Sequence, residues 1–188
     1  MTRVLNHAVG FDDGPFLPDH RGDIDLIGAV FASDCLVGVL RSRVRRDGAN
    51  ATERIARMTE ESRYLEQLHL VLLQGIAVAG FNVVDIHALA QRLTLPVVVV
   101  MRRHPDMQAV RDALLDKVPG GRRKWQLIEK AGPIREAVGV WLQCAGVSHE
   151  DAAKAVARLA LHGRMPEPLR VAHLIAGGIS PLRTRQRV

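Results

Sequence analysis

The chain has 188 residues, of which 47% are hydrophobic and 24% charged, a balance typical of a globular protein and not of a disordered one. Its length fits a single domain over residues 1–188. With 26 Lys and Arg against 20 Asp and Glu, the net charge is +6, so an anionic partner such as nucleic acid is expected. A basic composition bias without any such partner is the alternative.

The two cysteines, Cys35 and Cys144, are far apart and form no Cys-x-x-Cys or Cys/His pattern. This argues against a zinc site and predicts two unbridged thiols in a reducing, cytoplasmic environment. No apolar run approaches the roughly 18 residues of a membrane span, and no export signal opens the chain. The sequence therefore predicts a cytoplasmic protein without a membrane segment.

The first half of the chain begins with strands. Alternating and apolar patterns predict three of them, over residues 3–9, 24–32 and 35–45. Asn50 and Glu53 form a capping-box pattern, which predicts a helix that ends near Leu68. The continuous apolar run over residues 70–79 predicts a fourth strand that is buried on both faces.

Helices and strands then alternate. Asn82 is the expected cap of a helix to about Leu93, and Pro96 to Met101 is a second fully buried strand. The remaining expected elements are a helix over 105–118, a basic loop over 120–124, a strand over 137–143, a helix between Ser148 and Gly163, a helix over 169–176 and a basic tail with Arg183, Arg185 and Arg187. A three-stranded meander followed by this alternation predicts an α/β fold, with a ribonuclease H-like mixed sheet and helices on both faces.

Polar residues follow several of the predicted strands. They are Asp12 and Asp13 after the first strand, Asn82 and Asp85 after the fourth, and Arg102, Arg103 and His104 after the fifth. Ligands of α/β sheets bind at the carboxyl ends of the strands, and acids gathered there in an Arg-rich protein indicate a divalent cation that faces a phosphate. Structural roles are the alternative, because Asp12 and Asp13 could shape a turn and Asp85 could complement a helix N-terminus.

Arginines alternate along the third strand at Arg41, Arg43 and Arg45, so they share one strand face. The three arginines are candidates for binding phosphates, and Asn82 is a candidate for a nucleic-acid contact. For the arginines, the alternative is that their charges protect an exposed sheet edge. No Gly-x-Ser-x-Gly, P-loop or His-Glu-x-x-His pattern is present, which leaves acyl transfer, P-loop nucleotide hydrolysis and zincin chemistry without support.

Three stretches together resemble one family: residues 10–16 (GFDDGPF), 75–86 (GIAVAGFNVVDI) and 166–173 (PEPLRVAH). They are similar to the archaeal and bacterial family labelled endonuclease dU, and the similarity covers nearly the whole chain. That family is in turn similar to endonuclease V, a ribonuclease H-like enzyme that cuts nucleic acid near deaminated bases with Mg²⁺ or Mn²⁺. The resemblance implies a metal-dependent endonuclease that acts on deoxyuridine-containing DNA.

The resemblance also implies roles for residues of this chain. Asp12 corresponds to a metal-binding acid on the first strand, and His173 would approach the same site from the last helix as ligand or proton donor. The remaining candidates are Asp13, Asp47 and Asp85 as oxygen ligands, and Arg170 as a nucleic-acid contact. Ligands of one metal cluster should lie within roughly 8 Å of one another, and we expect this of Asp12 and His173.

The sequence also departs from endonuclease V. That enzyme carries an acid at the end of its fourth strand, where the stretch Val78-Ala79-Gly80 is expected to place alanine, and a second acid for which Asp47 is the nearest substitute. Asn50 stands where the family usually has aspartate, and no aromatic strand-separating wedge is visible. Two other functions therefore stay open: a non-catalytic nucleic-acid-binding protein on the same scaffold, and a small-molecule phosphohydrolase.

Overall fold

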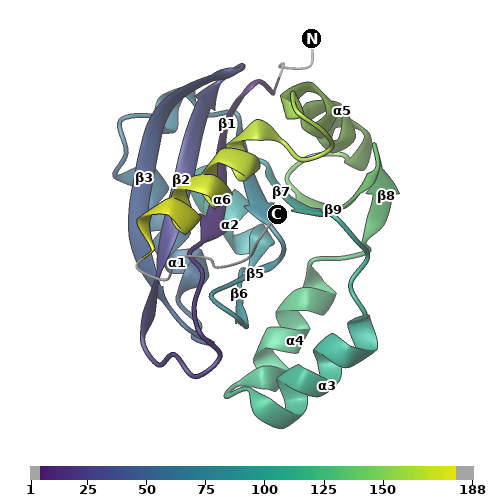
Figure 1. Ribbon diagram of the computed structural model, residues 1–188. Helices are drawn as coiled ribbons and strands as arrows, with labels where there is room; N and C mark the ends of the chain where they lie inside the picture. The colour runs from purple at the N-terminus through teal and green to yellow at the C-terminus, as the bar shows by residue number, and fades with distance from the viewer. Residues whose placement is uncertain (1–4, 181–188) are drawn as a thin grey trace.

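A seven-stranded mixed sheet forms the centre of the protein (Figure 1), whose computed structural model describes residues 5–180. Its strand order is β3-β2-β1-β4-β7-β9-β8. The strands are β1 (His7–Asp13), β2 (Asp23–Ala32), β3 (Cys35–Arg45), β4 (Leu70–Gln74), β7 (Val97–Met101), β8 (Arg135–Ala137) and β9 (Val140–Ala145). Strand β4 is parallel to both β1 and β7, and the other neighbouring pairs are antiparallel. The α/β class and the mixed sheet are confirmed.

Helices cover both faces of the sheet, as predicted (Figure 1). Helices α5 (His149–Leu159) and α6 (Glu167–Ile179) pack on one face, and α1 (Ala51–Glu60) and α2 (Ile86–Leu93) pack on the other. Because successive strand residues point to opposite faces, Ala8 of β1 lies in the α5–α6 core, and Val9 lies in the α1–α2 core. This alternation decides which polar residues at the strand ends share a face.

A third group of elements lies beyond the carboxyl ends of β4 and β7 (Figure 1). It consists of the short hairpin β5 (Ala77–Val78) and β6 (Asn82–Val83) and the helix pair α3 (Met107–Lys117) and α4 (Gly121–Lys130). These elements share a small core of their own, in which Val83, Leu114 and Ile128 are buried. These elements therefore pack beside the carboxyl ends of the central strands, where the candidate site residues lie.

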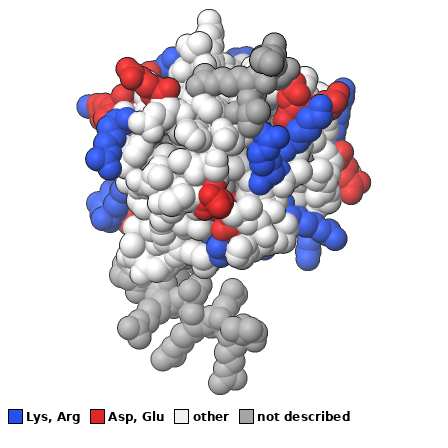
Figure 2. Space-filling view, turned by 90° about the horizontal axis from the view of Figure 1, so that it is seen from above, with Lys and Arg blue, Asp and Glu red and all other residues white. Residues whose placement is uncertain are grey.

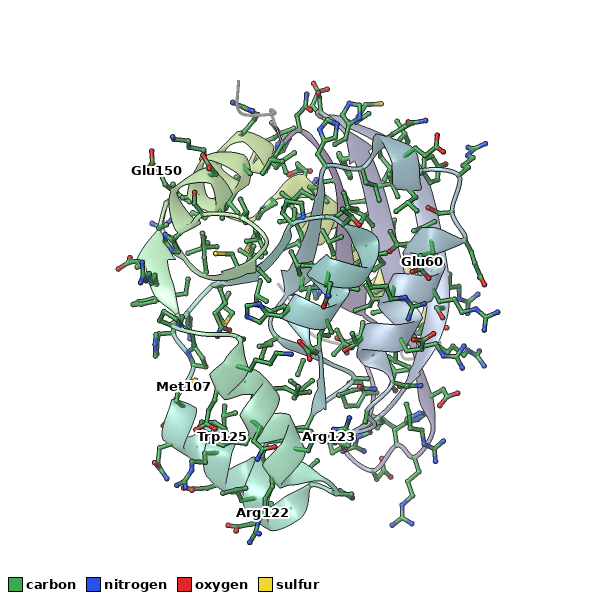
Figure 3. All side chains as sticks on the ribbon, turned by 180° about the vertical axis from the view of Figure 1, so that it is seen from behind. Glu60, Met107, Arg122, Arg123, Trp125 and Glu150 are labelled. Carbon is green, nitrogen blue, oxygen red and sulfur yellow. The ribbon has the colours of Figure 1, made fainter. Side chains whose placement is uncertain are left out.

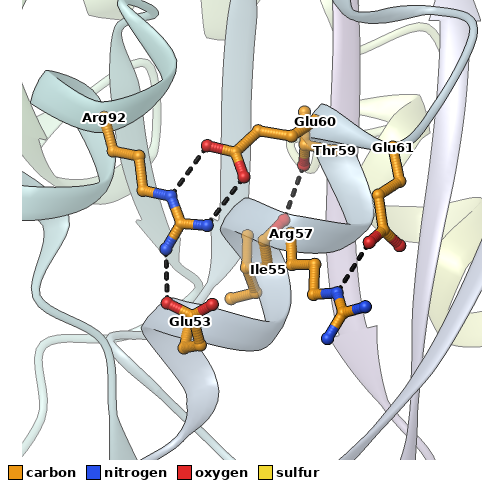
Figure 4. A network of polar contacts seen from close by, with 7 residues as sticks. All are labelled: Glu53, Ile55, Arg57, Thr59, Glu60, Glu61 and Arg92. Atoms are coloured by element: carbon orange, nitrogen blue, oxygen red, sulfur yellow. Dashed lines mark hydrogen bonds and ion pairs between the residues drawn. The ribbon is translucent and has the colours of Figure 1, made fainter.

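An ion-pair network links α1 and α2 on the surface (Figure 4). The guanidinium of Arg92 on α2 binds Glu53 and donates two hydrogen bonds of 2.7 Å to Glu60, both on α1. These hydrogen bonds raise the pKa of Arg92. Exposed ion pairs stabilise proteins by only about 0–1 kcal/mol each, so the buried face that holds Ile55 and Leu89 contributes more to this contact.

The predicted ten-residue buried strand over 70–79 is wrong in its length. Strand β4 ends at Gln74, where Gly75 adopts a positive φ of 84° that turns the chain into the β5–β6 hairpin. Val78 and Ala79 are still buried, so the apolar run reflects burial in the hairpin as well as in the strand. The first strand is also displaced, because it continues through Asp13, which pairs with Leu26.

One predicted helix start is wrong, and one predicted cap is absent at a helix start that is correct, since α1 begins directly after Asn50. Helix α2 is capped by Asp85, whose carboxylate accepts a hydrogen bond from the Ala88 amide, and Asn82 lies in β6 instead. Asn50 makes no capping hydrogen bond to α1; its side chain instead accepts one from the backbone N–H of Arg45. Both asparagines hold loops together, which local capping patterns cannot reveal.

Other boundaries differ in detail. Helix α1 ends at Glu60, and a short 3₁₀ turn, Leu65–Gln67, follows it. The predicted basic loop over 120–124 is the start of α4, the expected strand over 137–143 is a hairpin, and α6 is longer than 169–176. The predicted tail arginines lie outside the described residues.

The cysteines are unbridged, as predicted. Cys35 lies on β3 at one side of the sheet, whereas Cys144 lies on β9 near the other side. Among the described residues, no helix is both long enough and apolar enough to cross a membrane.

Candidate active site

Asp12 and His173 meet at the carboxyl end of β1. Asp12 is 5% exposed, and its Oδ2 lies 2.7 Å from Nδ1 of His173 on α6. The predicted proximity of the two residues is confirmed. Gly10 makes it possible, because a Cβ at this position would lie only 2.6 Å from the backbone nitrogen of Leu169. The missing side chain lets α6 approach β1, and Asp12, two residues later on the same face, reaches the helix.

The contact orients the imidazole of His173. Its Nδ1 faces the carboxylate of Asp12, whereas the side chain as a whole is 60% exposed. A carboxylate that accepts a hydrogen bond from Nδ1 fixes the ring and leaves Nε2 for exchange with a ligand. The pair thus combines a buried acid with an accessible proton carrier.

Gln74 is a site residue that the sequence reasoning missed. Phe11 pairs with Leu73 in the parallel β1–β4 ladder, so Gln74 is the neighbour of Asp12 in the next register position and shares its face. Its Oε1 is buried and has no hydrogen-bond partner within residues 5–180. Gln74, and not Ala79, ends the fourth strand. The signal was a single polar residue between an apolar run and Gly75.

Burial raises the pKa of both aspartates, and for Asp13 the charge of Asp12 adds to it. Burial raises the pKa of Asp12, against the opposing effects of His173 and Arg102. Burial and then the charge of Asp12 raise the pKa of Asp13 to about 6, although a hydrogen bond from the backbone of Ala79 opposes them. Perturbed carboxyl pKa values of this kind are common at functional sites.

The side chain and the carbonyl oxygen of Asp47 are held by contacts with neighbouring protein groups. Its Oδ1 accepts a hydrogen bond of 2.8 Å from the backbone of Phe81, and its side chain pairs with Arg46 at 3.2 Å. The buried Lys124 donates to its carbonyl oxygen at 2.5 Å. Within residues 5–180, no three His, Cys, Asp or Glu side chains form a group that could hold a metal ion. The expected ligands Asp12, Asp47 and Asp85 therefore do not form one cluster.

Asp85 is engaged at the start of α2. It caps the helix and accepts a hydrogen bond of 2.7 Å from Nζ of Lys130. Burial acts to raise the pKa of Asp85, but the hydrogen bonds from Ala88 and Lys130 outweigh burial and lower the pKa.

Asp85→Ala should lower the free energy of unfolding by about 1–2 kcal/mol at pH 7, because a cap and an ion pair are removed. A lowered folded-state pKa means that this stabilisation is present above the ordinary value of 3.8 and is lost as the pH falls through the folded pKa. The difference between the two proteins in denaturant titrations should therefore shrink only as the pH falls below 3.8. Asp85→Asn, which keeps the cap, should remain close to the parent, and a large loss of any catalytic activity in it would instead assign Asp85 to the active site.

The predicted nucleic-acid residues differ in exposure: the three arginines of β3 are exposed, whereas Asn82 is buried. Arg41, Arg43 and Arg45 are each more than half exposed on β3; the first two contact Asp25 at 3.1 and 3.3 Å, and Arg45 contacts Asp23 at 3.7 Å. They remain available to solvent, although their charge is partly balanced by β2.

Asn82, in contrast to these arginines, is fully buried. Its Oδ1 accepts a hydrogen bond from the Ala51 amide, and its Nδ2 donates to the Arg45 carbonyl and to Asn50. It cannot contact nucleic acid in this structure, because none of its surface is exposed. Arg170 is bound in a two-pronged pair by Glu167 at 2.8 and 2.7 Å.

At the end of the molecule opposite the candidate active site, the charged residues of the described chain form no basic patch that would indicate a nucleic-acid interface (Figure 2). Figure 2 views the protein from above, away from the carboxyl ends of β1 and β4, and shows Lys, Arg, Asp and Glu side chains mixed around a largely uncharged surface. Arg102, in contrast, is close enough to Asp12 to affect its pKa.

The endonuclease dU family model matches residues 5–180. The chain belongs to the endonuclease dU family. A UPF0215 protein of Deinococcus radiodurans is 52% identical over 176 residues, which cover 94% of this chain and 90% of the relative. A solved Archaeoglobus fulgidus protein of unknown function is 33% identical, with a TM-score of 0.86 and coverage of 92% of this chain and 97% of that chain.

More distant structures share the fold of this endonuclease dU family member. Human endonuclease V superposes with a TM-score of 0.57 at 17% identity, covering 92% of this chain and 83% of the other. Endonuclease V of Ciona intestinalis was solved in complex with DNA containing an inosine. It has a TM-score of 0.55 at 15% identity, and the match covers 89% of this chain and 82% of the other. The ribonuclease H-like fold is thereby confirmed.

Proposed function

We propose that this protein is a divalent-metal-dependent endonuclease that acts on deaminated, deoxyuridine-containing DNA. The family to which it belongs and the endonuclease V-like fold both suggest a nuclease. The observation that carries the proposal is the buried carboxylate of Asp12 at the carboxyl end of a central parallel strand, in contact with His173. This is the edge of an α/β sheet at which ligands bind.

The oxygen atoms beside Asp12 fit a hard cation. Mg²⁺ and Mn²⁺ prefer carboxylate, carbonyl and water oxygens, and Mg²⁺ needs only one or two protein carboxylates when substrate phosphates complete its shell. Asp12 and the unpartnered Oε1 of Gln74 would hold the cation, whereas Asp13, the next residue of β1, starts from the opposite strand face. A bound cation would supply Lewis-acid stabilisation of the phosphate and a nucleophilic water near neutral pH.

The chain's own residues would position and protonate the substrate. Asp12 holds the imidazole of His173 through Nδ1, so that Nε2 can donate a proton to the leaving oxygen. The positive charge of Arg102 near Asp12 would attract the phosphate to this edge. In this proposal the protein works in the cytoplasm, as its unbridged cysteines suggest.

The test is nicking of a uracil-containing oligonucleotide with added Mg²⁺, with Mn²⁺ and with EDTA. We expect cleavage with either metal and none with EDTA. Salt-sensitive binding without cleavage would favour the non-catalytic binding protein, a function that the lack of a three-ligand cluster in residues 5–180 also favours. Hydrolysis of small phosphate esters alone would favour the phosphohydrolase.

A triple variant tests whether the β3 arginines contact phosphates. It carries the substitutions Arg41→Gln, Arg43→Gln and Arg45→Gln, and it should bind DNA more weakly, to the same extent for every sequence. The slope of log affinity against log salt should flatten by about 0.7–0.9 for each phosphate that the variant no longer neutralises. Fluorescence anisotropy at several salt concentrations measures both effects. A slope that stays unchanged would assign the arginines to edge protection and to their pairing with β2.

A further inference from the structure

A small cavity opens beside the candidate active site. It has a volume of about 270 Å³ and is lined by the β5–β6 hairpin, the segment after β7 and the helices α3 and α4. Gly75 and Arg103 line it, and they directly follow Gln74 and Arg102 in the chain. The cavity therefore lies at the same carboxyl edge of the sheet as Asp12. Figure 3 shows Met107, another lining residue, where the α3–α4 pair approaches the sheet.

The cavity walls suit a single planar ring. They are mainly apolar, with Ile76, Met101 and Ile128 among the lining residues, and Phe81 adds an aromatic side chain. The volume is below the range of about 300–1,000 Å³ that is usual for drug-sized ligands. Enzymes that act on nucleic-acid bases commonly bind an extruded base between apolar and aromatic side chains.

One buried polar side chain forms part of the wall of this apolar space. Gln143 of β9 lines the cavity and is only 2% exposed. Its Nε2 donates a hydrogen bond of 2.7 Å to the carbonyl oxygen of Gly132, which can only accept. This bond fixes the amide, and the Oε1 is then left buried without a hydrogen-bond partner in the described part of the chain. An unsatisfied buried acceptor is unfavourable unless a ligand supplies a donor.

We propose that this cavity binds the uracil base of the substrate, and that Gln143 Oε1 accepts a hydrogen bond from the N3–H of uracil. Cytosine has an unprotonated nitrogen acceptor at this position, which would face the amide oxygen without a hydrogen, so the contact distinguishes the deaminated base from its parent. Thymine carries the same N3–H, so Gln143 separates uracil from cytosine and not from thymine. The exposed Arg103, which forms no ion pair with any residue between 5 and 180, supplies donors for a neighbouring base carbonyl.

The proposal rests on the proposed deoxyuridine function, and it is tested by binding instead of cleavage. In an Asp12→Asn background, single-stranded oligonucleotides with uracil or cytosine at one position are compared by fluorescence anisotropy. We expect about tenfold tighter binding of the uracil strand, the usual size of one buried hydrogen bond. Adding Gln143→Leu should remove this preference, whereas Gln108→Leu, a matched change of an exposed glutamine on α3, should keep it.

A second arm changes only the ligand and needs no substitution beyond Asp12→Asn. An oligonucleotide with N3-methyldeoxyuridine lacks the N–H donor and should bind as weakly as the cytosine strand. The proposal is overturned if the Asp12→Asn protein does not prefer uracil, if Gln143→Leu folds and keeps the preference, or if the methylated base binds as tightly as uracil. Metal-dependent cleavage by the parent protein is measured separately, so the nuclease function can stand when this base contact fails.

Discussion

Asp12→Asn should reduce metal-dependent cleavage by about 10³-fold or more while the protein stays folded. The expected loss follows from the several kcal/mol of transition-state stabilisation that a cation at this site provides, at about 1.4 kcal/mol per tenfold in rate. Asparagine has the same shape as aspartate but no charge, and burial already disfavours the charge of Asp12, as its raised pKa shows. The variant should therefore unfold at the same temperature as the parent or at a slightly higher one.

Single-turnover nicking assays and thermal unfolding measure the two effects on the same preparation. Asp85→Asn is the matched control, because it removes the charge of an acid that the structure engages in a helix cap. We expect the control to keep its cleavage rate within about threefold, the spread typical of substitutions outside a reacting site. Full activity in Asp12→Asn would end the nuclease proposal in the form given above.

Gly10→Ala should destabilise the protein by about 3 kcal/mol or more, which corresponds to a lower melting temperature by about 10 °C. The new Cβ would overlap the backbone of Pro168 and Leu169, and a backbone cannot rotate away as a flexible side chain can. Helix α6 must then move away from β1. Because His173 lies on this helix, cleavage at a temperature where the variant is folded should fall by about 100-fold, the effect of a displacement of about 1 Å.

Gly14→Ala is the control for this change. Gly14 lies four residues later and also approaches α6, but the nearest atom to a Cβ there is the carbonyl oxygen of Ala176 at 3.7 Å, an ordinary contact distance. Calorimetry should therefore show the Gly14→Ala protein close to the parent. If Gly10→Ala unfolds at the same temperature as Gly14→Ala, the close approach of α6 to β1 does not limit stability.

Much of the fold was readable from local patterns. The third strand, the start of α5 at Ser148 and the buried strand after Pro96 all lie where the sequence predicts them. Each depends on a signal within a few residues, namely alternation, a capping serine or a β-branched apolar run. The family resemblance then related Asp12 and His173, which lie 161 positions apart in the chain.

Contacts between distant segments decided the rest. Asn82 has the pattern of a helix cap, but its fully buried amide joins β6 to the end of β3 and the start of α1. The role of Asp47 as a support for the Phe81 turn also depends on a segment 34 residues away. Side chains of this kind have several good local partners, and only the packed structure selects among them.

The sequence by itself therefore determined the α/β class, the family and the pair Asp12 and His173. Only the tertiary structure decided that β4 stops at Gln74, that Gln74 follows the Phe11–Leu73 pair on the strand face of Asp12, and that Gln143 lines a cavity at the same edge. The reason is register. A sequence gives the polarity of a residue, but its neighbours across a sheet depend on which strands pair and at which position, and those are set by packing of the whole chain.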